Sequence, residues 1–194
     1  MKILSGAVIT VLTLLVIFLL FIYSGWYNVS ANEQENGIMK WVLNTTKDRS
    51  IESRSKDITV PDLNDSSMLK EGFEHYNEMC VSCHGAPGLE ETEVSVGLNP
   101  TAPYLVKVAK EIDPKELFWI TKNGIKMTGM PAWGKTHSDE KIWAIVAFVK
   151  KLPNMTAEEY QKMESPSGTM EGDEKHPDEN EPQTHSHSVE EHHH

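Results

Sequence analysis

Cysteine is scarce in this chain, and positive charge is not in excess. Cys80 and Cys83 are the only cysteines among the 194 residues. A structural zinc site takes four protein ligands, so two cysteines without a second ligand pair disfavour such a site. The net charge is −11. This argues against nucleic acid as a partner, because binding to phosphates requires a basic surface.

The acidity is concentrated at the C-terminus. Residues 154–194 contain eleven Asp or Glu and two Lys, a net charge of −9, which leaves −2 for the preceding residues. Because this tail has almost no apolar residues to bury, we expect it to be disordered and solvated. An alternative is weak capture of copper, nickel or zinc by its histidines. Six of the nine histidines lie in the tail: His176, His185, His187, His192, His193 and His194.

The N-terminus is a long apolar stretch without charge. Ile3 to Tyr23 is dominated by Leu, Ile, Val and Phe, and as a helix it would be about 31 Å long, enough to cross the hydrocarbon core of a bilayer. Trp26 and Tyr27 suit the membrane–water interface. A cleaved signal peptide is the alternative, with a possible cleavage site at residues 29–31. The apolar run is longer than a signal peptide requires, so we predict a transmembrane anchor over residues 1–23.

The segment Cys80-Val81-Ser82-Cys83-His84 forms a Cys-x-x-Cys-His motif, the attachment pattern of c-type haem. Two thiols on one helical turn can form thioether bonds with the two vinyl groups of haem, and the following imidazole can bind the iron. A bare Cys-x-x-Cys also occurs as half of a zinc site or as a redox dithiol. The added histidine and the N-terminus suited to export favour one covalent haem c.

A second axial ligand for the iron is expected from a methionine further along the chain. Met130 is preferred, since Pro131 restricts it to an extended conformation and Gly129 lets the backbone approach the ring. Met127 is the fallback candidate. A thioether opposite an imidazole is the ligand pair of electron-transfer cytochromes, and it raises the reduction potential.

Capping residues place three helices after the juxtamembrane segment. The first begins near Asp65 and runs to the motif, the second has Asp113 as its cap and stops at Asn123-Gly124, and the third opens at Ser138 and ends before Pro153. The chain thus divides into the anchor, a juxtamembrane segment at 24–65 without sustained periodicity, a domain at 66–153 and the tail at 154–194.

Residues 66–153 resemble a monohaem class I cytochrome c. The resemblance rests on Gly72 and Tyr76 ahead of the motif, on Gly129-Met130-Pro131, and on the aromatic positions of the last helix. It implies an all-α class I cytochrome c fold in which Gly72 and Tyr76 meet the face around Ile145 and Phe148. The resemblance also implies that a proline-containing loop offers a carbonyl to the iron-binding histidine. The candidates for that loop are Pro87, Pro100 and Pro103.

Two tryptophans and two further histidines complete the candidates. Trp119 and Trp133 could contact the haem edge or a propionate, although ordinary core packing explains them equally well. His75 and His137 could compete as iron ligands, but both are expected to face water.

Together these features predict an electron carrier, not an enzyme that turns over a small-molecule substrate. We expect the haem domain to lie on the periplasmic side of a bacterial inner membrane and to exchange electrons with donor and acceptor proteins. A close variant is a permanent cytochrome subunit of a membrane dehydrogenase or oxidase complex. Alternatives from other classes are a five-coordinate gas-binding haem protein and a metal-handling protein that uses the histidine-rich tail.

Overall fold

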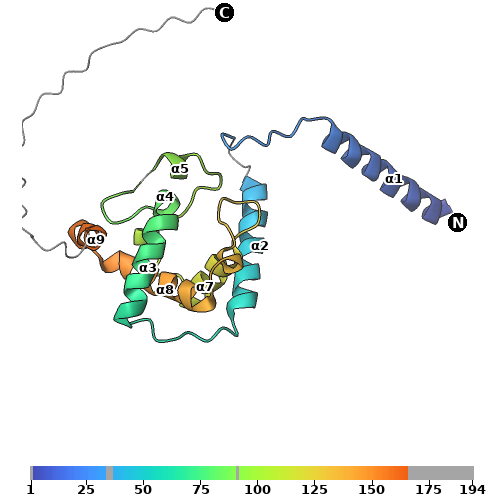
Figure 1. Ribbon diagram of the computed structural model, residues 1–194. Coiled ribbons are helices and arrows are strands. Elements are labelled where there is room, and N and C mark those ends of the chain that lie inside the picture. Colours follow the sequence, from blue (N-terminus) through green and yellow to red (C-terminus); the bar gives the residue numbers. More distant parts are fainter. Residues whose placement is uncertain (1, 34–36, 91, 166–194) are drawn as a thin grey trace, which may run out of the picture. The chain divides into compact units, whose positions relative to one another are not determined.

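The computed structural model describes residues 2–33, 37–90 and 92–165, and every regular element in these ranges is a helix (Figure 1). The predicted all-α fold is therefore confirmed, and the predicted disorder of the tail concerns residues that lie mostly outside the described ranges. The α-helices are α1 Lys2–Tyr23, α2 Gly37–Ser55, α3 Ser66–Met79, α4 Val81–His84, α5 Glu93–Val96, α6 Leu105–Val108, α7 Pro114–Asn123, α8 Asp139–Lys151 and α9 Ala157–Glu164. Two short 3-10 helices, η1 Trp133–Lys135 and η2 Leu152–Asn154, flank α8.

Helix α1 has the length and composition of a membrane span. The stretch Ile3–Tyr23 is 21 residues long, strongly apolar and exposed along its length. Such a helix satisfies its own backbone hydrogen bonds, which a lipid environment requires. This matches the predicted anchor.

The core of the domain is the crossing of α3 and α8. Asp65 caps α3 by accepting hydrogen bonds from the backbone N–H groups of Ser67 and Met68. At the crossing, a Cβ atom on Gly72 would lie 2.0 Å from the carbonyl oxygen of Ala144, so only glycine lets the two backbones come this close. One turn later Tyr76 is fully buried, with its ring centroid 5.4 Å from that of Phe148. The predicted contact between the two helices is confirmed.

Helix α7 packs beside α8 and begins and ends where its capping residues predict. Asp113 accepts a hydrogen bond from the backbone N–H of Lys115, and Gly124 ends the helix with a positive φ of 65°. The rings of Phe118 and Trp143 stack with centroids 4.2 Å apart. This stacking fixes α7 against the last core helix.

The juxtamembrane segment contains a 19-residue helix, α2, although the sequence showed no sustained period there. Ile51 and Ser55 near its C-terminal end are buried, and α2 packs against α7. Lys115 of α7 also donates a hydrogen bond to the carbonyl of Lys56, at 3.3 Å. The period was missed because the apolar residues cluster in the first two turns, and the single later one, Ile51, points away from Val42.

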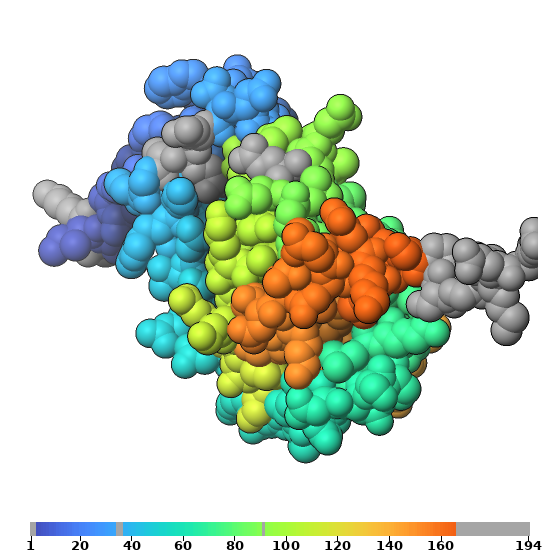
Figure 2. All heavy atoms as spheres, turned by 90° about the vertical axis from the view of Figure 1, so that its left-hand side faces the viewer, coloured from blue at the N-terminus to red at the C-terminus, as the bar shows by residue number. Residues whose placement is uncertain are grey.

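The packed part of the chain continues beyond residue 153, where the sequence interpretation began the tail. Helix α9 brings Tyr160 into the core at 4% exposure, with its ring centroid 5.4 Å from that of Phe73. Figure 2 shows this segment, in orange to red, lying against the green surface of α3. Residues 157–164 are therefore corrected from tail to domain. The sequence analysis missed this helix because a single aromatic residue, Tyr160, in a polar stretch does not change its overall composition.

The hydrogen bond from the Tyr160 hydroxyl to Asn77 Oδ1, at 2.9 Å, provides a test of this docking. We expect Tyr160→Phe to lower the free energy of unfolding by about 1 kcal/mol, the usual net value of one such bond. A double-mutant cycle with Asn77→Ala, followed by denaturant unfolding of the haem-loaded chain, should give a coupling energy of about the same size. Additive effects of the two substitutions would show that the hydrogen bond between Tyr160 and Asn77 does not contribute to the docking of α9.

Candidate haem and iron site

The Cys-x-x-Cys-His motif occupies a single helical turn at the end of α3. Cys80 ends α3 and begins α4, and its carbonyl oxygen accepts hydrogen bonds from the backbone N–H groups of Cys83, at 3.1 Å, and His84, at 2.9 Å. Both cysteines are free thiols, with Cys80 buried and Cys83 half-buried. The turn therefore presents two thiols and an imidazole in the order that haem attachment requires.

The ring of His84 is oriented by the backbone of the loop before α6. Its Nδ1 lies 2.9 Å from the carbonyl oxygen of Pro103, and because a carbonyl can only accept, Nδ1 carries the proton. Burial lowers the pKa of His84, and the bond to Pro103 opposes that shift. The result is a neutral imidazole whose Nε2 has its lone pair free for a metal ion. Of the three candidate prolines, Pro103 is the one whose carbonyl contacts the ring of His84.

Two tyrosine hydroxyls hold the backbone that follows His84. Tyr76 donates to the carbonyl of Gly85 at 2.6 Å, and Tyr104 donates to the carbonyl of Ala86 at 2.9 Å. Burial raises the pKa of Tyr76, so its hydroxyl stays protonated and remains a donor. Gly85 has a φ of 68°, a conformation that favours glycine. The sequence analysis assigned no role to Tyr104. Its position next to Pro103, a candidate contact of His84, could have indicated that it lies at the site.

The loop that carries Met130 is closed by its own backbone. The N–H of Ile125 donates to the carbonyl of Met130 at 3.2 Å, and the N–H of Met130 donates to Thr128 Oγ1 at 3.1 Å. Gly129 comes so close to Leu98 that an added Cβ would lie 2.8 Å from the leucine side chain. The methionine loop thus meets the loop that leads to Pro103.

The two candidate methionines differ in their surroundings. Met130 is half-buried, whereas Met127 is 90% exposed and has a φ of 62°. A side chain directed into solvent makes no packing contact that would hold it over a ring. This difference supports Met130 over Met127, and the bond from Met130 to iron stays a prediction.

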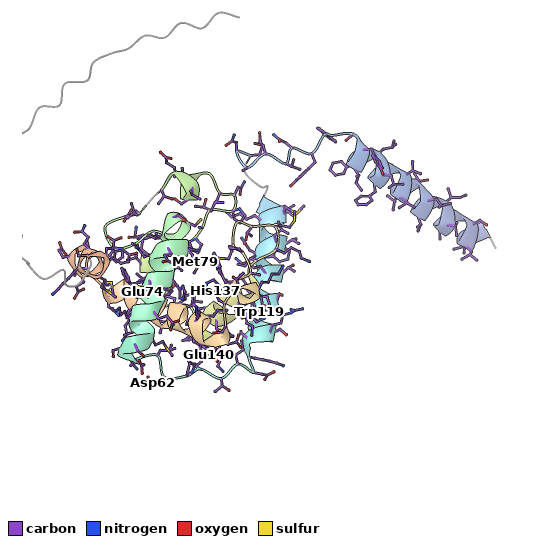
Figure 3. The ribbon with its side chains drawn as sticks, viewed as in Figure 1. Asp62, Glu74, Met79, Trp119, His137 and Glu140 are labelled. Carbon is purple, nitrogen blue, oxygen red and sulfur yellow. The ribbon has the colours of Figure 1, made fainter. Side chains whose placement is uncertain are left out.

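The expectation that His75 and His137 face water is wrong. The His75 side chain is 18% exposed, and its ring centroid lies 5.2 Å from that of His137. The ring of Trp133 lies edge-on to His137, with centroids 5.5 Å apart. Figure 3 shows His137 close to the crossing of α3 and α8. Residues that sequence spacing places far apart meet here because those two helices cross.

The predicted haem contacts of Trp119 and Trp133 remain predictions. Trp119 is half-buried on α7 (Figure 3), and its carbonyl accepts a hydrogen bond from Asn123 at 2.9 Å. Trp133 is half-buried at the start of η1.

Within the described ranges no group of three His, Cys, Asp or Glu side chains could hold a separate metal ion.

The residues present fit a covalently attached haem. Cys80 and Cys83 are unpaired with each other despite sharing one turn, and the free Nε2 of His84 follows them directly. Cys80 and Cys83 would hold the porphyrin, and His84 would bind its iron. Such a haem supplies reversible one-electron chemistry between ferrous and ferric iron.

Comparison with known proteins agrees with this geometry. Residues 67–149 match the family described as cytochrome C oxidase, cbb3-type, subunit III. No curated protein and no solved structure matches the chain. The matched range runs from the start of α3 into α8 and includes the Cys-x-x-Cys-His motif and Met130. Residues 67–149 therefore form a cytochrome c domain, which implies one covalent haem c with its iron at the Cys-x-x-Cys-His motif, and the apolar helix α1 is consistent with a membrane anchor.

Proposed function

We propose that this cytochrome is a one-electron carrier whose iron is bound by His84 and Met130. The hydrogen bond from His84 Nδ1 to the carbonyl of Pro103, at 2.9 Å, is the observation that carries the proposal. It fixes the tautomer and the direction of the ring in the way that a permanent iron ligand requires. The closed loop around Met130, which is half-buried, supports this methionine as the second ligand.

If His84 and Met130 both bind the iron, no position on it would remain for a substrate. The residues of the chain then act by holding and orienting. Cys80 and Cys83 fix the porphyrin, and Pro103 keeps the imidazole from rotating. Tyr76 and Tyr104 hold the adjoining backbone. A rigid site lowers the reorganisation that accompanies each electron transfer, and the partner proteins carry out the chemistry.

We place the haem domain on the outer face of a bacterial inner membrane. Covalent attachment of haem c takes place outside the cytoplasm, so Cys80 and the residues after it must cross the membrane. Helix α1 would keep the domain close to membrane-bound donors and acceptors. Lys2 precedes the apolar stretch, and a basic residue at that end of a membrane helix favours a cytoplasmic N-terminus.

The family description favours a second candidate function, that of a permanent subunit of a membrane oxidase complex. The two functions share the same site and the same ligands. They differ in whether the partner dissociates between electron transfers. Extraction of native membranes in mild detergent separates them, because a permanent partner would remain with the cytochrome at a fixed ratio.

The test of the proposed ligation is optical. The full chain, produced together with haem-attachment machinery, should show one haem per chain in a pyridine haemochrome assay. Its oxidised and reduced spectra should both be low-spin and should interconvert on addition of a chemical reductant and oxidant. A high-spin ferrous spectrum that changes on exposure to carbon monoxide would contradict the carrier and support a gas-binding protein.

A further inference from the structure

The first two turns of α2 expose apolar side chains that the domain does not cover. Ile38 is 79% exposed and Trp41 is 67% exposed, unusually high fractions for such side chains in a packed helix. Four neighbours form this apolar surface: Ile38, Trp41, Val42 and Leu43. A contiguous apolar surface of this kind marks contact with another molecule or with a membrane.

The centre of this surface lies opposite the side of α2 that packs on the domain. Val42 precedes the buried Ile51 by nine residues, and at about 100° per residue the two side chains point in roughly opposite directions. Ile51 and Ser55 are buried and α2 packs against α7, and Figure 1 shows α2 running alongside that helix. The domain can therefore rest on one side of α2 while the other side contacts something else.

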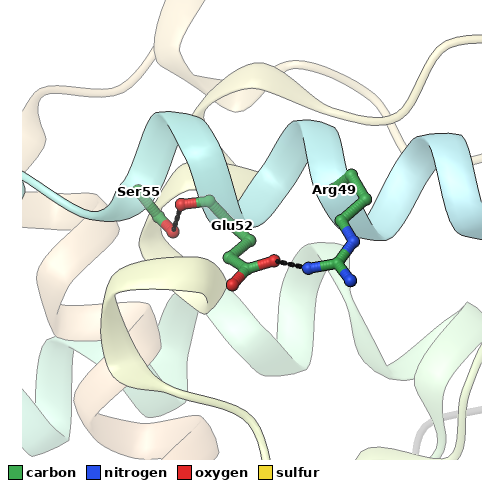
Figure 4. A network of polar contacts seen from close by, with 3 residues as sticks. All are labelled: Arg49, Glu52 and Ser55. Carbon is green, nitrogen blue, oxygen red and sulfur yellow. Dashed lines mark hydrogen bonds and ion pairs between the residues drawn. The ribbon is translucent and has the colours of Figure 1, made fainter.

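The charges of α2 suit an anionic surface. The helix contains four basic and two acidic residues, a net charge of +2, whereas the whole chain is negative. One acidic residue, Glu52, pairs with Arg49 at 2.9 Å (Figure 4), and the backbone carbonyl of Glu52 accepts a hydrogen bond from Ser55. An apolar side combined with basic residues is the composition of helices that lie in a lipid headgroup region.

The chain keeps this surface near the bilayer. Thirteen residues, 24–36, separate the end of α1 from the start of α2, and even fully extended they reach no more than about 45 Å. Trp26 in this linker is 83% exposed. Asn99 of the domain donates hydrogen bonds to the carbonyls of Ala31 and Glu33, at 3.0 and 2.8 Å. These bonds shorten the effective tether further.

We propose that the first two turns of α2 insert their apolar side chains into the headgroup region of an anionic bilayer, so that the haem domain is held against the membrane surface. The proposal rests on α1 being a membrane anchor. In this arrangement α2 makes two contacts. Ile38 and Val42 contact lipid, and Ile51 and Ser55 contact the domain. A flexible tether would let the domain rotate freely, whereas a surface-bound helix restricts its orientation.

Photocrosslinking of the full haem-loaded chain in phosphatidylglycerol vesicles tests the proposal. Benzoylphenylalanine is placed at Ile38 or Val42, and at Asn44 as a matched control. Asn44 is exposed and lies two residues from Val42, on roughly the opposite side of the helix. After illumination and proteolysis, mass spectrometry measures lipid adducts on α2. We expect about tenfold more adduct at positions 38 and 42 than at 44, as an interfacial helix requires.

Two outcomes would overturn the proposal. One is an equal, low yield of lipid adduct at all three positions, and the other is crosslinking of positions 38 and 42 to a polypeptide in native membranes without any lipid adduct. The second outcome would assign the surface to a partner subunit. The visible spectrum of each variant serves as a folding control, because a normal low-spin haem spectrum separates failure of this proposal from failure of the electron-carrier proposal.

Discussion

Met130→Ala is expected to lower the reduction potential by on the order of 0.2 V, a substantial part of the roughly 0.8 V that axial ligands can span. A thioether ligand stabilises ferrous iron, so water or a weaker ligand in its place favours the ferric state. The variant should also become high-spin in at least one oxidation state. A potentiometric titration followed in the visible spectrum measures both effects on the same sample.

Met127→Ala is the matched control, because Met127 belongs to the same loop and is 90% exposed. This substitution should leave the potential and the spin state unchanged. If Met127→Ala removed the low-spin spectrum and Met130→Ala preserved it, the ligand assignment would be reversed. If neither variant changed the spectrum, the second ligand would lie elsewhere in the chain.

Gly72→Ala is expected to destabilise the domain by about 3 kcal/mol, at the upper end of overpacking effects. The added Cβ would lie 2.0 Å from the carbonyl oxygen of Ala144 and 2.9 Å from the Cβ of Phe148. The carbonyl is backbone and cannot rotate away, so α3 and α8 must separate. Denaturant unfolding of the haem-loaded chain in detergent measures the loss.

Gly97→Ala provides the comparison. The nearest atoms to a Cβ at Gly97 lie 3.6 Å away, an ordinary contact distance, and its φ is −84°. Stability should change by no more than about 0.5 kcal/mol, as is usual for surface positions. Equal effects of the two substitutions would mean that the helix crossing tolerates an extra methyl group.

Helix ends marked by capping residues could be predicted from sequence alone. Asp65, Asp113 and Ser138 stand immediately before α3, α7 and α8. The side chains of Asp65 and Asp113 accept hydrogen bonds from backbone N–H groups of the first turn, as helix caps do. The motif Cys80–His84 could also be identified from sequence alone, because haem attachment depends on residues that are close together in the sequence.

Features that depend on distant contacts were missed or left open. The choice of Pro103 over Pro87 and Pro100 is made by the folded position of His84, which composition does not encode. Helix α9 is docked through the ring of Tyr160, whose contact with Phe73 joins residues far apart in the sequence. The meeting of His75 and His137 has the same origin.

The burial of Cys80 has a consequence for the biogenesis of the protein. Cys80 belongs to the same buried cluster as Phe148 and Tyr160, which come from helices late in the chain. In a chain that emerges N-terminus first, α8 begins 59 residues after Cys80 (139 − 80). The thiol of Cys80 is therefore open to haem only while these late helices are not yet packed over it, and we expect haem attachment to precede completion of this cluster.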